Sequence, residues 1–210
     1  PIDMFNVTLI CNGEIYNYKQ LYNDLNITPK TNSDCEVIIH LYLKYGIETT
    51  LQMLDGVFSF VLYDRNDMEL PVYIARDPFG IRSLYSFLFR NTSNDCNNVN
   101  IVGFASELKC LSEFYNSIDN TDTSKEIVKE NLISDNYLTQ FTPGTFSKLY
   151  LKADRAICDY EYKIKNKPYF MLPFSYRLDN TVYLQETILN TIYLQLCDAV
   201  KKRVTTTDRE

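Results

Sequence analysis

The sequence contains very little histidine, and this scarcity limits the chemistry that the chain can perform. His40 is the only histidine among 210 residues. Sites in which several imidazoles bind a metal or act as general bases are therefore excluded. His40 lies in a helical pattern of apolar residues, so we interpret it as a surface or core-rim residue rather than a catalytic one.

Basic residues and long apolar runs are also lacking. The 21 basic residues are outnumbered by 27 acidic ones, and the net charge is −6, whereas a nucleic-acid-binding domain normally carries a basic surface. No apolar stretch approaches the ~20 residues of a membrane-spanning helix. The first residues lack the basic and apolar segments of a signal peptide. We expect a cytoplasmic protein that binds neither nucleic acid nor membranes.

Closely spaced cysteines are absent. No two of the six cysteines form a CxxC pair, which excludes a zinc ribbon and a thioredoxin motif. Cys11, Cys35 and Cys110 lie among apolar residues, where a free cysteine behaves as a small hydrophobic residue. A disulfide framework is disfavoured in a chain without a secretion signal. The sequence thus predicts no metal site, and it contains no glycine-rich phosphate loop.

The residues that are present predict a globular α+β domain, since 45% are hydrophobic and 23% are charged. Ser33-Asp34-Cys35-Glu36 resembles a capping box that opens a helix, and Gly46 ends that helix before a shorter one runs to Leu54. Other helices are predicted near residues 17–25, 107–114 and 180–204. Runs of apolar and β-branched residues predict strands at residues 7–11, 57–63, 71–75, 84–88, 101–105 and 146–151.

Three short segments carry polar residues that suggest either chemistry or simple turns. Asn12-Gly13-Glu14 follows a predicted strand, where an Asn amide and a Gly N–H would form an oxyanion hole. A plain Asn-Gly turn is the favoured interpretation on these residues alone. Asp34 would either stabilise a helix end or bind a ligand ammonium group, and the helix end is favoured.

The third segment, residues 76–82, has the sequence Arg-Asp-Pro-Phe-Gly-Ile-Arg and joins two predicted strands. Its charged and turn residues would form either an internally bonded corner or a clamp for a substrate. Because the segment connects strands, a structural corner is the favoured interpretation.

Five motifs follow one another along the chain: Asn-Gly-Glu-Ile-Tyr-Asn at 12–17, Ser-Asp-Cys-Glu-Val-Ile at 33–38, Leu-Asp-Gly-Val-Phe-Ser-Phe at 54–60, Arg-Asp-Pro-Phe-Gly-Ile-Arg at 76–82 and Ala-Ser-Glu-Leu-Lys at 105–109. In this order they resemble the glutaminase domain of glutamine-hydrolysing asparagine synthetases. A turn at 141–144 and the final helix also match the family pattern. The resemblance implies an N-terminal-nucleophile hydrolase fold, an αββα sandwich of two mainly antiparallel sheets.

The resemblance also implies roles for particular residues. The side chain of Asn12 and the N–H of Gly13 would stabilise the oxyanion, while Glu14 and Asp34 would bind the α-ammonium group of glutamine. The family's nucleophile is an N-terminal cysteine whose own α-amino group acts as base. That cysteine, and the arginine that binds the glutamine carboxylate, precede the first motif by many residues in the family and have no counterpart in this sequence.

The resemblance divides the chain into three parts. Residues 1–151 would form a glutaminase domain without its N-terminal part, 152–179 a linker, and 180–210 the start of a synthetase domain. In the parent protein, ATP and Mg²⁺ in the synthetase domain would activate aspartate, which ammonia converts to asparagine. A homodimer is one assembly that the family allows.

Three hypotheses remain open at this point. The favoured one makes the chain a fragment of an asparagine synthetase, inactive by itself. The second is a degenerate glutamine-binding or interaction module without catalysis. The third, the least favoured, is a tautomerase in which the secondary amine of Pro1 acts as a general base.

Overall fold

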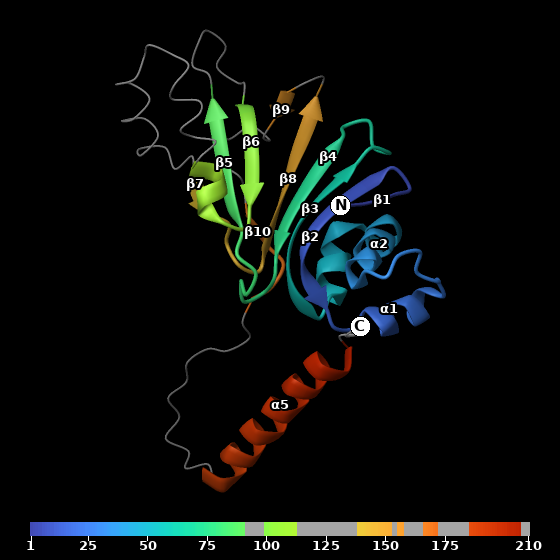
Figure 1. The fold of residues 1–210 in the computed structure, drawn as a ribbon, viewed down its shortest axis with the longest axis vertical. Coiled ribbons are helices and arrows are strands. Elements are labelled where there is room, and N and C mark those ends of the chain that lie inside the picture. The colour runs from blue at the N-terminus through green and yellow to red at the C-terminus, as the bar shows by residue number, and fades with distance from the viewer. Residues whose placement is uncertain (91–98, 113–137, 153–154, 158–165, 172–184, 207–210) are drawn as a thin grey trace.

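The computed structural model of the chain describes residues 1–90, 99–112, 138–152, 155–157, 166–171 and 185–206 (Figure 1). The strands are β1 (Ile2–Met4), β2 (Val7–Ile15), β3 (Gly56–Asp64), β4 (Pro71–Arg76), β5 (Tyr85–Arg90), β6 (Val99–Ala105), β7 (Leu138–Gln140), β8 (Thr145–Lys152), β9 (Arg155–Ile157) and β10 (Lys167–Pro168). The helical elements are α1 (Tyr18–Leu25), the 3-10 turn η1 (Asp34–Glu36), α2 (Val37–Met53) and α5 (Gln185–Thr206). A further short helical segment covers residues 108–112.

The strands form antiparallel pairs throughout, in the order β1-β2-β3-β4-β8-β9-β6-β5-β7, with β10 paired to β8. Figure 1 shows two groups of strands, β1 to β4 with β8 on one side and β5 to β7 on the other. The short strand β9 joins the groups, and it pairs with β6 only through Val99 and Ala156. The predicted α+β fold with two antiparallel sheets is confirmed, with this narrow junction between the sheets.

A helical layer covers one face of the first sheet. Alternate residues of β2 point to opposite faces, so Val7, Leu9 and Ile15 are buried while Ile10 is 60% exposed on the other face. The buried residues pack against α1 and α2, where Ile38 has no exposed surface. The core of the first sheet therefore lies between β2, β3 and these two helices.

Gly46 interrupts α2 as the sequence predicts. Its φ of 76° and ψ of 171° lie outside the helical region, in a conformation that glycine adopts far more readily than other residues. The chain resumes helical geometry at once, and the hydroxyl of Thr50 donates a hydrogen bond to the Gly46 carbonyl at 2.8 Å. The predicted pair of helices on either side of Gly46 is confirmed.

The predicted turn at Asn12-Gly13 is wrong. Both residues lie inside β2, where Asn12 pairs with Ser59 and Gly13 with Phe58 of β3. A Cβ on Gly13 would lie 2.3 Å from the carbonyl oxygen of Val57. Glycine is therefore required here by the close approach of two backbones, and no turn conformation is involved.

The predicted capping box forms only in part. The Ser33 hydroxyl accepts a hydrogen bond from the Cys35 N–H at 3.3 Å. The Glu36 carboxylate instead accepts the N–H groups of Lys30 and Thr31, at 2.8 and 2.6 Å, and lies 3.0 Å from Nε2 of His40. A fully buried carboxylate requires several hydrogen-bond donors. Because Glu36 takes two of them from the backbone of residues 30 and 31, it holds the loop before η1 in place.

The segment predicted to be a linker contains strands that pair with the sheet. Within the predicted connection at 152–179, β9 and β10 both bond to β8. The sequence also predicts a hairpin tip at the Asn-rich residues 91–100 and a surface excursion at 116–136, and residues 91–98 and 113–137 lie outside the described residues. The division of the chain into three parts stays a prediction.

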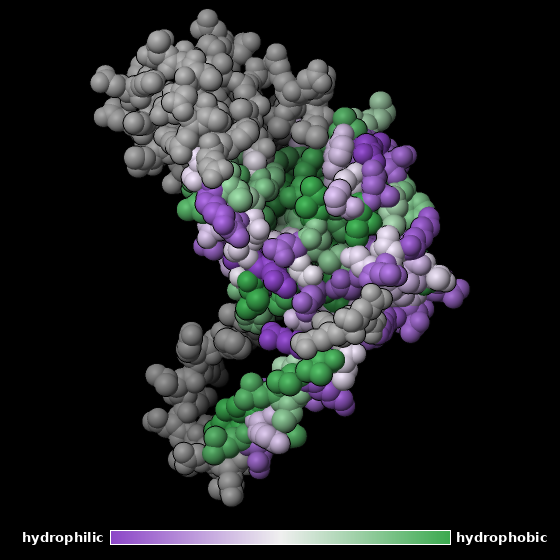
Figure 2. Space-filling model, in the orientation of Figure 1, coloured by the Kyte–Doolittle hydropathy of each residue, from purple (hydrophilic) through white to green (hydrophobic). Residues whose placement is uncertain are grey.

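The helix α5 extends away from the sheets and approaches them at its C-terminal end (Figure 1). There Lys202 Nζ lies 2.7 Å from a carboxylate oxygen of Asp55, and the Arg203 guanidinium lies over the Tyr16 ring. Figure 2 shows apolar residues gathered along this helix, and Leu189 and Leu196 are about three-fifths exposed, at 60% and 61%. None of the described helices is long and apolar enough to cross a membrane.

Candidate functional site

The C-terminal half of β2 has one edge that β1 does not cover. The pairing of β1 with β2 extends only to Leu9, so the strand edge at Gly13 and Ile15 faces η1 instead. The Ile15 N–H donates to the carboxylate of Asp34 at 2.5 Å. The Cys35 thiol donates to the Gly13 carbonyl at 3.8 Å. These two contacts place η1 directly beside the predicted glutamine site.

The Gly13 N–H points toward the same edge. Successive residues of an antiparallel strand direct their N–H groups to opposite sides, so Gly13 and Ile15 share one direction and Asn12 and Glu14 the other. Ile15 already donates to Asp34, whereas no described strand pairs with Gly13 on this side. The Gly13 N–H therefore points toward an edge that no described strand covers, next to the exposed side chain of Asn12.

Glu14 lies on the face of β2 opposite the helices, with a cationic partner. Oε1 of Glu14 is 3.6 Å from a guanidinium nitrogen of Arg82, and both side chains are partly exposed. A pair with this exposure is worth at most about 1 kcal/mol to stability. Its consequence is local, because it places a positive charge beside a carboxylate of the predicted site.

Arg82 ends a corner whose hydrogen bonds are internal. The buried carboxylate of Asp77 accepts the N–H groups of Phe79, Ile81 and Arg82 at 3.1, 3.0 and 3.0 Å. These bonds explain why an acidic residue occupies the first position after β4. The favoured interpretation of residues 76–82 as a structural corner is thereby supported.

The guanidinium of Arg76 completes this corner. It donates to the carbonyl groups of Arg82, Gly80 and Phe141 at 2.7, 2.8 and 2.6 Å. Burial lowers the pKa of Arg76 from its ordinary value, and the three carbonyl acceptors compensate the buried cation. The Asp77 N–H also donates to the Phe58 carbonyl at 2.7 Å, so the corner is bonded to the strand that faces Gly13.

The structure brings all four residues predicted to bind glutamine to the end of β2. Asn12, Gly13 and Glu14 occupy successive positions of that strand, and Asp34 bonds to the backbone of the next residue. Sequence reasoning missed the ion pair between Glu14 and Arg82. The motif spacing carries no signal for this pair, because only the tertiary fold brings residue 82 next to residue 14.

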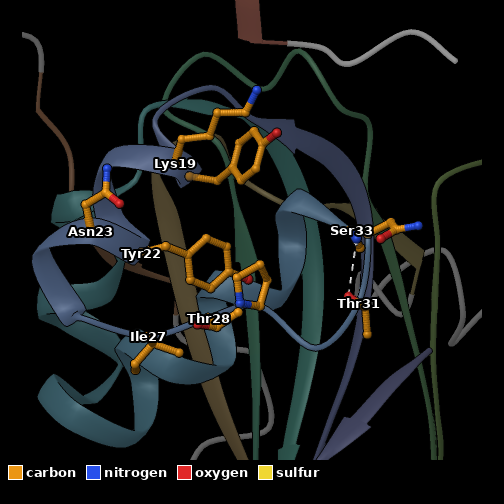
Figure 3. Close-up of a pocket in the computed structure, with 10 residues that line it drawn as sticks. Lys19, Tyr22, Asn23, Ile27, Thr28, Thr31 and Ser33 are labelled. Carbon is orange, nitrogen blue, oxygen red and sulfur yellow. Dashed lines mark hydrogen bonds between the residues drawn. The ribbon is translucent and has the colours of Figure 1, made fainter.

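A separate pocket of about 920 Å³ lies between α1 and the loop at 27–33 (Figure 3). Its walls carry mostly hydroxyl, amide and aromatic side chains, from Tyr18, Lys19, Tyr22, Asn23, Ile27, Thr28, Pro29, Thr31, Asn32 and Ser33. The Tyr22 hydroxyl is buried and has no hydrogen-bond partner in the described chain. Burial, followed by the nearby carboxylates of Glu36 and Asp34, raises the pKa of Tyr22. None of the four predicted glutamine ligands lines this pocket.

Among the described residues, no group of three or more His, Cys, Asp or Glu side chains is arranged to hold an ion. The site at the end of β2 instead combines uncharged donors with carboxylates. Such a set suits a ligand that carries both an ammonium group and a carbonyl oxygen.

Comparison with known proteins finds several relatives of this chain. The family model described as a glutamine amidotransferase domain matches residues 2–155. A probable glutamine-hydrolysing asparagine synthetase of Acanthamoeba polyphaga mimivirus is 42% identical over 102 residues, which cover 49% of this chain and 17% of that protein. The glutamine-hydrolysing asparagine synthetase of Homo sapiens is 31% identical over 206 residues, 96% of this chain and 32% of that protein.

A solved structure is also similar. It is the glutamine phosphoribosylpyrophosphate amidotransferase of B. subtilis complexed with ADP and GMP, with a TM-score of 0.49 and 22% sequence identity over 81% of this chain and 31% of that chain. The present chain thus spans about a third or less of the relatives that it matches.

Proposed function

We propose that this chain, which belongs to the glutamine amidotransferase domain family, binds glutamine at the end of β2 and there supports hydrolysis of its side-chain amide. The single observation that carries the proposal is the joint placement of Asn12, Gly13, Glu14 and Asp34 around one strand end. The family match is independent support, since it comes from sequence and not from this geometry.

The Asn12 amide and the Gly13 N–H would act as the oxyanion donors. When a nucleophile attacks the side-chain carbonyl of glutamine, negative charge develops on the carbonyl oxygen. Uncharged donors that are already in place stabilise this charge without reorganisation. The requirement for a backbone N–H at this point agrees with the absence of a described strand paired with β2 on that side of Gly13.

The carboxylates of Glu14 and Asp34 would bind the α-ammonium group of the substrate. Asp34 reaches β2 from the helical side through its bond to Ile15, and Glu14 reaches the same strand end from the side of Arg82. Charge-assisted hydrogen bonds from an ammonium group to two carboxylates would orient glutamine.

In the proposed reaction, a cysteine nucleophile attacks the amide carbon, ammonia leaves, and water hydrolyses the acyl intermediate to glutamate. The resemblance assigns this role to an N-terminal cysteine of the family, and none of the six cysteines in this sequence is assigned to it. The contribution of the present residues is to hold the substrate and to stabilise the oxyanion.

For the whole protein we propose ATP-dependent amidation of aspartate to asparagine in the cytoplasm, with the released ammonia as the nitrogen source. The support is the similarity to asparagine synthetases over 96% of this chain. The sequence contains no glycine-rich phosphate loop, and the described residues contain no group of three or more His, Cys, Asp or Glu side chains that could hold an ion. The nucleotide would bind elsewhere in the protein.

The test is a titration of this chain with glutamine followed by amide NMR. We expect the Gly13 and Ile15 amide signals to shift, because they lie at the proposed site. Asp34→Asn should weaken binding at least about tenfold by the loss of a charged ligand, whereas Asp24→Asn, an exposed position on α1, serves as the matched control. Amide signals that shift only for residues of the pocket in Figure 3 would contradict the proposed glutamine site. Equal glutamine affinity of the two variants would also contradict it.

A further inference from the structure

Two cysteines from separate elements lie together behind the proposed glutamine site. Cys35 of η1 is only 5% exposed, and its sulfur contacts the Gly13 carbonyl at 3.8 Å. Cys11 lies two residues before Gly13 on the same face of β2, and it packs against the same apolar cluster as Cys35. The fold thus brings two cysteines that are far apart in the sequence into one apolar cluster.

The Cys35 thiol influences the ionisation of the Cys11 thiol. A hydrogen bond with the Cys35 thiol, followed by burial, raises the pKa of the Cys11 thiol. Among the charged groups that face Cys11, Asp34 raises this pKa and Arg82 lowers it. Cys11 is therefore a neutral thiol at physiological pH.

The other cysteines offer no comparable arrangement within the described chain. Cys110 and Cys197 are exposed and free, and they belong to the 108–112 segment and to α5. Cys96 and Cys158 lie outside the described residues. The neighbouring pair is thus a specific feature of the β2 and η1 junction.

We propose that Cys11 and Cys35 form an oxidisable dithiol, which hydrogen peroxide converts to a disulfide that crosslinks β2 to η1. In the first step a thiolate sulfur attacks one peroxide oxygen, the O–O bond breaks, and the departing hydroxide takes up a proton as water. The second thiol then attacks the resulting sulfenic sulfur and displaces a second water. Both thiols lose their hydrogen atoms, and the peroxide is reduced to two water molecules.

The crosslink would act on the geometry around Asp34. Bond formation brings the two sulfurs to about 2.0 Å and draws Cys35 from its contact with the Gly13 carbonyl. Asp34 directly precedes Cys35, so we expect its bond to the Ile15 N–H to be disturbed. The expected effect is weaker glutamine binding in the oxidised form, and this consequence rests on the proposed function.

The chemical test uses the chain with Cys96, Cys110, Cys158 and Cys197 all replaced by serine. Treatment with hydrogen peroxide should lower the intact mass by about 2 Da, the two hydrogen atoms lost, and dithiothreitol should reverse the change. Peptide mapping should find a peptide with Cys11 linked to one with Cys35. Cys11→Ser and Cys35→Ala in this background should each abolish the link.

Other outcomes overturn the proposal. Oxygen added to a single cysteine without a crosslink, or a chain that stays unmodified at high pH in excess peroxide, would show that the thiols are not poised to join. Because the thiolate is the reacting form and the pKa of Cys11 is raised, the crosslinking rate should increase as pH rises from 7 to 9. A rate independent of pH also contradicts the mechanism.

Glutamine binding separates this proposal from the proposed function. Binding by the reduced chain tests the function, while formation of the crosslink tests the dithiol. A reduced chain that does not bind glutamine refutes the function alone, and a crosslink that leaves glutamine affinity unchanged refutes the regulatory consequence.

Discussion

At the scale of single residues, Glu36 shows how one buried carboxylate orders the approach to the site. Its oxygens accept backbone N–H groups from Lys30 and Thr31 and contact His40. Burial by itself would raise the pKa of Glu36, but the hydrogen bonds from Thr31, Lys30 and His40 outweigh it, and the pKa is lowered from 4.5. The ionised form is therefore the one that stabilises the native chain.

The first prediction concerns the pH dependence of this contribution. A group whose pKa is lowered on folding adds stability above its unfolded pKa, and that stability is lost as pH falls through the folded value. Glu36→Gln should therefore destabilise the chain by about 2 kcal/mol at pH 7, with a smaller difference below pH 4. Urea unfolding across this range measures it, and Glu48→Gln, at an exposed position of α2, is the control. A pH-independent difference contradicts the assignment.

The second prediction concerns Gly13. Gly13→Ala would place a Cβ 2.3 Å from the Val57 carbonyl oxygen and 2.7 Å from the Phe58 Cα, and backbone atoms of a central strand pair have little freedom to move. We expect a loss of more than about 2 kcal/mol from overpacking, measured by thermal unfolding. Gly103→Ala is the matched control in β6, since its Cβ would meet the end of the Leu111 side chain at 3.2 Å. Equal effects of the two substitutions would contradict the explanation.

At the scale of elements, the corner at residues 76–82 follows β4, precedes β5 and lies beside the site. The Asp77 carboxylate and the Arg76 guanidinium form hydrogen bonds with backbone groups that a tight connection leaves unpaired. The same segment positions Arg82 beside Glu14. A connection between strands therefore also determines the charge next to the proposed substrate.

The third prediction tests this corner. Asp77→Ala removes the acceptor of three backbone N–H groups at a side chain that is only 1% exposed. Leaving those donors unsatisfied should cost about 3 kcal/mol or more. The measurement is chemical denaturation, with Asp24→Ala as the exposed control. A loss below about 1 kcal/mol would mean that the corner is held by other contacts.

At the scale of the whole molecule, the described strands and the helices α1 and α2 that cover one face of them place the site at the end of β2. The site is formed by three segments that lie apart in the sequence: β2, η1 and the corner that carries Arg82. The pocket between α1 and the loop at 27–33 is a separate feature. Kinetics of the whole protein should show whether glutamine hydrolysis depends on the site at the end of β2 or on the pocket.

The fourth prediction uses that distinction in the full-length protein. Asn12→Ala should lower the glutamine-dependent turnover by ~10²–10³, because one oxyanion donor is lost. Asn23→Ala, in the wall of the pocket, should leave turnover and the glutamine requirement unchanged. Steady-state glutamate production measures both. An Asn12→Ala variant with normal turnover but weaker glutamine binding would assign Asn12 to substrate binding alone.

Much of the fold and the composition of the candidate site follow from local sequence. The β-branched and aromatic run of β3 predicts its strand, and Gly46 predicts the break in α2, because both depend on backbone preferences of neighbouring residues. The motif series identifies Asn12, Gly13, Glu14 and Asp34 as site candidates. The bonds of the Asp77 carboxylate to the N–H groups of residues 79, 81 and 82 also follow from turn chemistry within one short segment.

Tertiary structure decides what depends on distant partners. Asn12-Gly13 favours a turn in isolation, but pairing with β3 along the full length of β2 overrides that preference. The Glu36 carboxylate accepts the N–H groups of Lys30 and Thr31 rather than completing a capping box, because the folded loop places those donors around it. The ion pair of Arg82 with Glu14 and the contact of Cys35 with Gly13 likewise exist only in the folded chain. Local preferences thus determine the elements, while long-range pairing determines which side chains meet at the site.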